Sequence, residues 1–324
     1  MARLTHVRPG VDPGYRRIRA GRSFRYEDEK GKAAPNAAVR RIRELVIPPA
    51  WEDVWIAVDP HAHIQAVGVD DAGRRQYIYH PHWRLRQDRT KFTRALALAE
   101  ALPRARARVT STLHRGELGQ DVTLAASFRL LDEAAPRVGS ARYFNKHGSR
   151  GLTTLQRRDA TVVESAVTLS FPAKSGQRAF LEIDDAELAA VIVHLIEGRA
   201  RSPLLWYLRG RRQMGLTPSE VNAYVRTLTG GAFTAKDFRT LRGTILAAES
   251  LARIGTVDTE SDRKRAEVLA VRATATALGN TPSVARGSYI DPRVFQRYAR
   301  GELLDLSVSG ETAIRRLLSD DPEG

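Results

Sequence analysis

The apolar residues near the N-terminus form short runs separated by turn-forming residues. Residues 54–58, 64–69 and 75–79 are rich in β-branched and aromatic side chains, and Asp59-Pro60 and the stretch 70–73 lie between them. Runs of this length bounded by Asp, Pro and Gly are typical of antiparallel β-strands joined by turns. The pattern therefore predicts a meander of three strands.

The same region contains one more predicted strand and one predicted helix. Residues 23–26 favour a strand, and the stretch 36–45 has helical spacing and stops before Pro48-Pro49. We expect about the first 85 residues to form a small antiparallel sheet with a helix packed on it.

From Asp88 onward the apolar residues recur at helical spacing. Asp88 is expected to begin a helix that ends at Pro103, because proline removes a backbone donor and clashes with the preceding turn. Thr217-Pro218-Ser219-Glu220 has the pattern of a capping box with proline in the first turn. Further helices are predicted after Thr234, over residues 185–198 and 260–278, and on either side of Tyr289.

One β-hairpin interrupts this helical region. Residues 167–171 and 179–183 have strand composition, and the turn between them carries Lys174 at its tip. The predicted fold class is α+β, with a small N-terminal antiparallel β-sheet domain over residues 1–85 and a larger, mainly α domain with a short hairpin over residues 86–324.

The composition is that of a globular chain without disulfide or thiolate chemistry. Hydrophobic residues make up 42% of the 324 residues, and cysteine is absent, which excludes thiolate nucleophiles and Cys-ligated zinc. No apolar run approaches the ~20 residues that span a bilayer, and no apolar signal segment follows the Arg-rich N-terminus. We expect a cytoplasmic protein without a membrane partner.

The charge balance indicates a polyanionic partner. Lys and Arg total 52 against 37 acidic residues, a net charge of +15. A GC-rich genome explains why arginine is preferred to lysine, but not why basic residues outnumber acidic ones. Such an excess attracts nucleic acid and releases its condensed counterions on binding.

Several common catalytic motifs are missing. The sequence contains no Walker phosphate loop, no dinucleotide fingerprint and no His-Glu-x-x-His helix. The pairs His61/His63 and His80/His82 would each share one face of a strand, but no cysteine or clear carboxylate ligand accompanies them. We therefore expect no metal and no nucleotide cofactor.

Phosphoryl transfer without a metal must rely on side chains. Guanidinium groups neutralise charge on a phosphorane, a nucleophile attacks the phosphorus, and an acid protonates the departing oxygen. Composition alone leaves the choice open among 45 arginines and nine tyrosines.

Five separated motifs narrow that choice. They are Gly73-Arg74-Arg75-Gln76-Tyr77-Ile78-Tyr79, then Arg137-Val138-Gly139 with Tyr143 and Gly151-Leu152-Thr153-Thr154-Leu155, then Lys174-Ser175-Gly176, Lys236-Asp237-Phe238-Arg239-Thr240, and Gly279-Asn280-Thr281-Pro282 through Tyr289. In this order they resemble the type IB DNA topoisomerases of the poxviral and bacterial branch. The resemblance extends from about Gly14 to Tyr298.

The resemblance implies a catalytic role for five residues. Tyr289 would attack the scissile phosphodiester, leaving a 3′-phosphotyrosyl bond and a free 5′-hydroxyl. Arg137 and Arg239 would stabilise the phosphorane, and Lys174 would protonate the leaving 5′-oxygen. Asn280 stands where the poxviral and eukaryotic enzymes have histidine, and its amide still donates a hydrogen bond. The enzyme would need neither ATP nor metal.

The hairpin departs from the family pattern, because Phe171-Pro172-Ala173 precedes Lys174 where Arg-Gly is expected before the lysine. Proline alters the turn and so the aim of Lys174, although Arg178 is not expected to replace it.

The resemblance also implies a DNA interface. Arg75, Tyr77 and Tyr79 would share one face of a strand that contacts the duplex. The full set of expected DNA-binding residues is Arg75, Gln76, Tyr77, Tyr79, Tyr143 and Lys236. Double-stranded DNA is the expected partner of a bacterial, nucleoid-associated monomer, with the N-terminal domain as a clamp and the tyrosine-recombinase-like C-terminal domain as the catalytic part.

Two other functions are compatible with parts of the sequence. A tyrosine recombinase would use the same Arg, Lys, Arg and Tyr, but usually has histidine at the position of Lys236 and a helical N-terminal part. A non-catalytic DNA-binding protein would show the same charge but form no covalent adduct with DNA.

Overall fold

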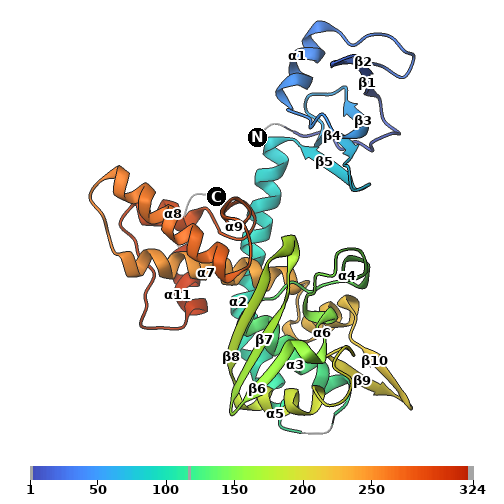
Figure 1. The fold of residues 1–324 in the computed structure, drawn as a ribbon. Helices are drawn as coiled ribbons and strands as arrows, with labels where there is room; N and C mark the ends of the chain where they lie inside the picture. The colour runs from blue at the N-terminus through green and yellow to red at the C-terminus, as the bar shows by residue number, and fades with distance from the viewer. Residues whose placement is uncertain (1–2, 116–117, 320–324) are drawn as a thin grey trace. The chain divides into compact units, whose positions relative to one another are not determined.

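The computed structural model describes residues 3–115 and 118–319. The chain forms two compact units, residues 1–90 and 91–324 (Figure 1). Each unit has its own group of buried apolar side chains.

The first unit is built on a five-stranded antiparallel sheet in the order β2-β1-β3-β4-β5. Its strands are β1 (Gly14–Ala20), β2 (Ser23–Glu27), β3 (Glu52–Ala57), β4 (Ile64–Val69) and β5 (Arg75–Tyr79). Four of them lie at or near predicted positions, whereas β1 was not predicted. Its sequence GYRRIRA contains three arginines and only one strongly apolar strand former, so the pattern of alternation is hidden.

Helix α1 (Asn36–Glu44) covers the core of this sheet as predicted. Ile42 of α1 is buried with Tyr15, Val54 and Ile56 from the strands. Any larger residue at Gly14 of β1 would clash with Trp55, because a Cβ atom there would lie 1.9 Å from Nε1 of Trp55 on the neighbouring strand.

The predicted start of the next helix at Asp88 and its predicted end at Pro103 are both wrong. Helix α2 extends from Pro81 to Leu113 and contains Pro103 in its interior. Buried side chains continue at helical spacing on both sides of the proline, including Leu98, Leu102, Ala105 and Val109. An interior proline costs about 3 kcal/mol, and burial of each large aliphatic side chain returns about 1.5–3 kcal/mol, so packing outweighs the break.

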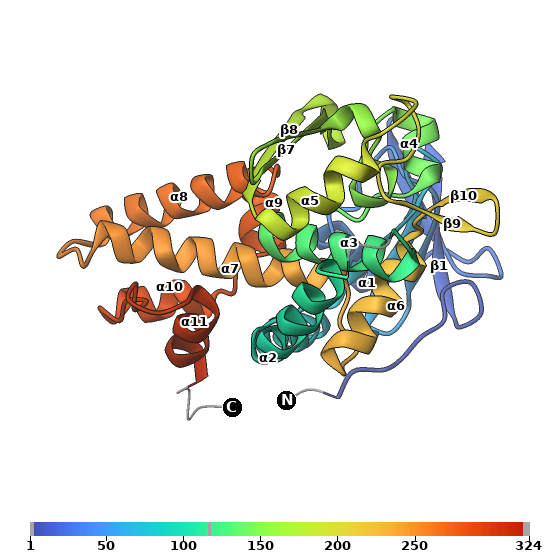
Figure 2. The same cartoon turned by 90° about the horizontal axis from the view of Figure 1, so that it is seen from below.

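The second unit is mainly helical. Its remaining helices are α3 (Gln120–Ala134), α4 (Ala141–His147), α5 (Ala186–Leu195), α6 (Pro218–Thr229), α7 (Ala235–Ile254), α8 (Glu260–Ala277), α9 (Pro282–Ser288), α10 (Arg293–Ala299) and α11 (Gly310–Ser319). The predicted capping box at Thr217 and Glu220 is present, and α8 ends at the predicted residues. Figure 2 shows α7 and α8 side by side along much of their length.

A three-stranded antiparallel sheet contains the predicted hairpin. Strands β7 (Ala166–Pro172) and β8 (Arg178–Asp184) pair as expected, and β6 (Ala160–Val163) adds a third strand. Helices α3 and α5 pack against this sheet (Figure 2). A second hairpin, β9 (Trp206–Arg209) with β10 (Arg212–Gly215), was not predicted because strands of four residues are too short to show a clear alternation.

These elements confirm the α+β class, with an N-terminal antiparallel sheet and a mainly helical region that carries small sheets. No helix among the described residues is both long and apolar enough to cross a bilayer.

Candidate active site

Arg137 lies in a loop that is held in place by hydrogen bonds and close packing of the backbone. The backbone N–H groups of Leu152 and Thr153 donate to the carbonyls of Arg137 and Val138 at 2.8 and 2.9 Å. A Cβ atom on Gly151 would lie 2.5 Å from the Arg137 carbonyl oxygen, so only glycine allows this approach. The Gly-Leu-Thr-Thr-Leu motif therefore fixes the loop that presents Arg137.

Arg239 projects from the second turn of α7 and is buried, with 4% of its surface exposed. Its Nη1 donates to the carbonyl of Ala135 at 2.6 Å, and its Nη2 donates to the carbonyl of Leu278 at 2.8 Å. The Nε atom is buried and has no partner among the described residues. Two carbonyls thus orient the guanidinium, while its Nε–H has no partner among the described residues.

Asn280 is placed by the end of α8. Gly279 adopts a left-handed conformation with φ of +57°, and the N–H groups of Gly279 and Asn280 donate to the carbonyls of Thr276 and Ala275. This pair of bonds is a Schellman motif, in which glycine avoids the cost that a Cβ atom would impose. Asn280 follows this turn immediately.

The side chain of Asn280 binds Arg137. Its Oδ1 accepts a hydrogen bond from Nη2 of Arg137, which also donates to the Gly279 carbonyl at 2.9 Å. Its Nδ2 is buried and has no partner among the described residues. Because buried donors are nearly always satisfied, Nδ2 of Asn280 and Nε of Arg239 are available to a ligand oxygen.

Tyr289 follows the last turn of the short helix α9 and is partly buried. The guanidinium of Arg239 lies 4.9 Å from the centroid of its ring. Two residues of α7 hold its main chain: a Cβ atom on Gly243 would lie 2.7 Å from the Tyr289 carbonyl oxygen, and the Thr244 hydroxyl lies 3.2 Å from the same oxygen. The Thr244 hydroxyl also accepts from the backbone N–H of Asp291.

Positive charge controls ionisation at this site. Burial by itself would raise the pKa of the Tyr289 phenol, but the charges of Arg239, Arg137 and Lys236 outweigh it and hold that pKa below its ordinary value. Burial lowers the pKa of Arg137, and the charge of Arg239 lowers it further. The phenol therefore loses its proton more readily than a free tyrosine.

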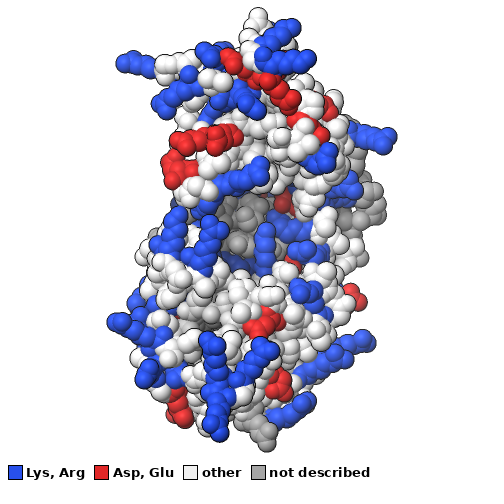
Figure 3. All heavy atoms as spheres, turned by 90° about the vertical axis from the view of Figure 1, so that its right-hand side faces the viewer, with Lys and Arg blue, Asp and Glu red and all other residues white. Residues whose placement is uncertain are grey.

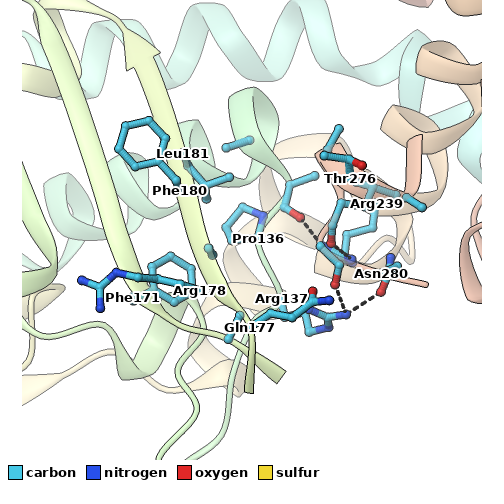
Figure 4. Close-up of a pocket in the computed structure, with 18 of the residues that line it drawn as sticks. Pro136, Arg137, Phe171, Gln177, Arg178, Phe180, Leu181, Arg239, Thr276 and Asn280 are labelled. Atoms are coloured by element: carbon cyan, nitrogen blue, oxygen red, sulfur yellow. Dashed lines mark hydrogen bonds between the residues drawn. The ribbon is translucent and has the colours of Figure 1, made fainter. Parts of the chain in front are cut away.

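A cavity of about 540 Å³ opens beside the two arginines and Asn280, and Tyr289 is not among the residues that line it. Arg137, Arg239 and Asn280 line one side, and Phe171 and Phe180 of the β7–β8 hairpin line another (Figure 4). The arrangement gives a concave, positively charged surface with buried donors, suited to an anion with several oxygen atoms.

Lys174 is not brought to this group. It is exposed in a short 3₁₀ turn, Lys174–Gly176, and does not line the cavity, although its neighbours Ala173 and Gln177 do. Arg178 borders the cavity, but its Nε donates to Oγ of Ser170 and its guanidinium points away from Arg137 (Figure 4).

Arg150 is a residue of the site that the sequence did not reveal. Its backbone N–H donates to the Pro172 carbonyl at 2.7 Å, and its guanidinium forms a buried ion pair with Asp159 at 2.7 Å. Arg150 thereby ties the base of the hairpin turn to the segment that fixes Arg137. Gly243 and Thr244 were also missed, although a glycine inside a predicted helix is itself a signal of close packing.

The remaining expected DNA-binding residues of the second unit lie near the site without joining it. Tyr143 is in α4, where its ring lies 4.6 Å from that of His147. Tyr143 and His147 line a second cavity, of about 510 Å³, together with Pro172 and Gly176 of the hairpin. Lys236 is exposed in the first turn of α7.

In the first unit, β5 forms an edge of the sheet. The rings of Tyr77 and Tyr79 stack at 5.9 Å and 13°, so the expected alternation is present. Arg75 is exposed on the same strand, and the side-chain amide of Gln76 donates to Asp70 at 2.8 Å. Stacked aromatic rings beside a cation form a suitable surface for a nucleic-acid backbone.

The histidine pairs make aromatic contacts. His63 packs with Trp83 and His6, and His80 lies edge-on to His82. Within the described ranges, no group of three or more His, Asp or Glu side chains is arranged to hold a metal ion.

Basic side chains are spread over the face shown in Figure 3, with fewer acidic ones between them. This distribution agrees with the net charge of +15 and provides a long-range attraction for a polyanion.

Comparison with known proteins agrees with this geometry. A family model described as the catalytic core of eukaryotic DNA topoisomerase I matches residues 80–301, and one for the N-terminal domain of bacterial DNA topoisomerase IB matches residues 23–70. The DNA topoisomerase 1B of Acanthamoeba polyphaga mimivirus is 26% identical over 295 residues, covering 88% of this chain and 86% of that protein. The chain therefore belongs to the type IB DNA topoisomerases, isomerases that act on DNA.

Proposed function

We propose that this topoisomerase relaxes supercoiled duplex DNA by cutting and resealing one strand through a phosphotyrosyl bond at Tyr289. One observation carries the proposal: the free donors of Asn280 and Arg239 are buried beside Arg137, and the Arg239 guanidinium lies against the ring of Tyr289. A scissile phosphate in the cavity would receive hydrogen bonds from these groups while the phenol approaches it.

In the cleavage step, the phenolate oxygen of Tyr289 attacks phosphorus, and the bond from phosphorus to the 5′-oxygen breaks. The 5′-oxygen takes up a proton and leaves as a hydroxyl, and the 3′ end stays on Tyr289. Arg137, Arg239 and Asn280 stabilise the additional negative charge of the phosphorane. Resealing is the reverse reaction.

Lys174 is the proposed acid for the 5′-oxygen. An ammonium on a flexible four-carbon stem can swing toward a substrate and lose its proton when other cations surround it. Its exposed place in the hairpin turn requires that the turn move when DNA binds. Apo geometry of this kind does not exclude a general acid.

The energy of the broken phosphodiester is kept in the phosphotyrosyl bond, so the proposed cycle uses neither ATP nor a metal ion. Between cleavage and resealing, the free 5′ end rotates about the intact strand and releases torsion. In this proposal residues 1–85 form a clamp domain and residues 86–324 the catalytic domain of a bacterial monomer that works on DNA in the cytoplasmic nucleoid.

A plasmid-relaxation assay tests the proposal. The wild-type chain should relax a supercoiled plasmid that lacks any defined recombination site, and Tyr289→Phe should lose this activity, because it lacks the attacking oxygen. Tyr26→Phe, which removes a partly buried hydroxyl in the first unit, is the matched control and should retain it. Undiminished relaxation by Tyr289→Phe would rule out this nucleophile, and dependence on a specific site would favour a recombinase.

A further inference from the structure

A stretch of the second unit concentrates positive charge without any acidic residue. Residues 198–219 contain five arginines and neither Asp nor Glu. All five are exposed, and none has an ion-pair partner among the described residues. The arginines are Arg199, Arg201, Arg209, Arg211 and Arg212.

Three of these arginines lie at the tip of the β9–β10 hairpin, whose two strands are labelled in Figure 1. Arg209 and Arg212 are direct cross-strand partners, and Gly210 and Arg211 form the two-residue turn between them. Gly210 has a φ of +62°, as expected for glycine at the first central position of a tight hairpin turn. The turn therefore holds three guanidinium groups within four consecutive residues.

The three neighbouring charges destabilise the hairpin in the protein without DNA. Like charges directly opposite each other in a β-pair repel, and a two-stranded hairpin alone is only marginally stable. The acidic residue that follows the segment, Glu220, already accepts hydrogen bonds from Tyr207, Gln120 and Thr217. No acidic side chain among the described residues therefore pairs with the tip, and its three charges are open to an anionic partner.

The stem of the hairpin is firmly attached to the second unit. The hydroxyl of Tyr207 donates to Glu220 at 2.8 Å, the indole of Trp206 donates to the Leu195 carbonyl at 3.1 Å, and Thr123 donates to the Trp206 carbonyl. Tyr207 is buried, whereas Leu208 is 55% exposed. A rigid stem with a charged tip loses little conformational entropy when the tip binds a partner.

We propose that the tip formed by Arg209, Arg211 and Arg212 is a contact for the phosphate backbone of duplex DNA, separate from the catalytic group. DNA is the partner of this enzyme family, and guanidinium forks match phosphate oxygens. A two-stranded ribbon is also narrow enough to follow a groove of the duplex. Because the contacts are to phosphates, the interaction adds affinity and orientation without sequence preference.

The experiment measures binding of a linear duplex as a function of salt concentration. The protein carries Tyr289→Phe throughout, so that binding is read without covalent chemistry and the result does not depend on which residue is the nucleophile. Each phosphate contact contributes about 0.9 to the slope of log Kd against log salt. Replacing Arg209, Arg211 and Arg212 together with glutamine should reduce that slope by about 2 to 3, equally on two duplexes of unrelated sequence.

The matched control removes the same net charge from exposed cations that have acidic partners. These are Arg253, Lys264 and Arg265, which pair with Glu249, Glu260 and Asp262 on α7 and α8. Their replacement by glutamine should leave the slope within about one unit of the starting protein. An unchanged slope in the tip variant overturns the proposal, as does an equal loss in the control. Thermal unfolding of the tip variant should show no loss of stability, because the replaced charges repel each other.

Discussion

Asn280 brings a neutral donor into a cavity that two guanidinium groups otherwise dominate. Its Oδ1 orients Arg137, and its Nδ2 remains available to a non-bridging phosphate oxygen. In the proposed mechanism this single amide both positions Arg137 and binds the phosphate.

Replacement of Asn280 with leucine tests this double role. The variant keeps a similar volume but loses both the acceptor for Arg137 and the free donor, so single-turnover strand cleavage should slow about 100-fold. Rapid-quench measurement at saturating DNA would show the loss. A cleavage rate equal to that of the wild type would mean that Asn280 does not contact the reacting phosphate.

The pH dependence of cleavage follows from the charges around Tyr289. Because Arg239, Arg137 and Lys236 hold the pKa of the phenol below its ordinary value, the rate should rise with pH and level off at a pH below about 10. Lys236→Gln removes one of these charges and should move the plateau to higher pH, which lowers the rate at pH 8.

The control for this profile is Lys264→Gln, which removes an exposed lysine on α8 that is paired with Glu260. It should leave the position of the plateau unchanged. If both variants shift the profile equally, the effect comes from net charge and not from the neighbourhood of the phenol.

The candidate site residues could be predicted from the sequence, but their contacts could not. Tyr289, Arg137, Arg239 and Asn280 follow from ordered motifs, and the structure brings all four together, while their roles stay predictions. The free donor of Asn280 was not predictable, because it depends on which atoms surround the amide in three dimensions. The sequence indicated an altered turn before Lys174, but not that this turn leaves the side chain outside the cavity.

At the scale of elements, α7 organises the site. It carries Arg239 toward the cavity and, one turn later, offers Gly243 and Thr244 to the main chain of Tyr289. The proposed phosphate-binding residue, Arg239, and the residues that hold the proposed nucleophile therefore share one helix. Such a helix can keep reacting groups in register to within a fraction of an ångström.

Gly243→Ala should separate packing from helix propensity. Alanine is the better helix former by about 1 kcal/mol, yet its methyl group would lie 2.7 Å from the Tyr289 carbonyl oxygen and would displace the nucleophile. We expect cleavage to fall at least about tenfold with near-normal DNA binding. Gly287→Ala, whose methyl group meets no atom within 4 Å, controls for the gain in helix propensity. Equal cleavage rates in Gly243→Ala and the wild type would show that close packing at Gly243 does not position Tyr289.

Elements with a clear apolar period were predictable, and those without one were not. Helices α1 and α8 and the β7–β8 hairpin appear where the pattern placed them. Strand β1 was not predicted because three arginines interrupt its alternation, and β9 and β10 were not predicted because four residues are too few to show one. Helix α2 continues through Pro103 because side chains on both sides of the proline are buried. That burial depends on tertiary contacts, which a local sequence rule does not include.

At the scale of the whole molecule, the excess of basic residues indicated a polyanionic partner before any motif was considered, and the family match makes DNA that partner. The division into a clamp over residues 1–85 and a catalytic domain over residues 86–324 stays a prediction. Charge alone did not distinguish an enzyme from a packaging protein, because both neutralise phosphates.

The cofactor requirement of plasmid relaxation tests the proposed chemistry of the whole enzyme. Side-chain chemistry at Tyr289 predicts that plasmid relaxation proceeds without ATP and persists in EDTA, for positive and negative supercoils alike. Topoisomer distributions on agarose gels would check this. Abolition of activity by the chelator, with recovery on addition of a divalent cation, would contradict a site made of side chains only.

The most direct test of the central claim is to trap the covalent adduct and map it. The protein is denatured during cleavage of an end-labelled duplex and digested with protease, and the peptide that retains the label is sequenced by mass spectrometry. We predict a peptide containing Tyr289 joined to the 3′-phosphate of the cut strand, and no adduct from Tyr289→Phe. An adduct on another residue, or a link to the 5′ end, would contradict it.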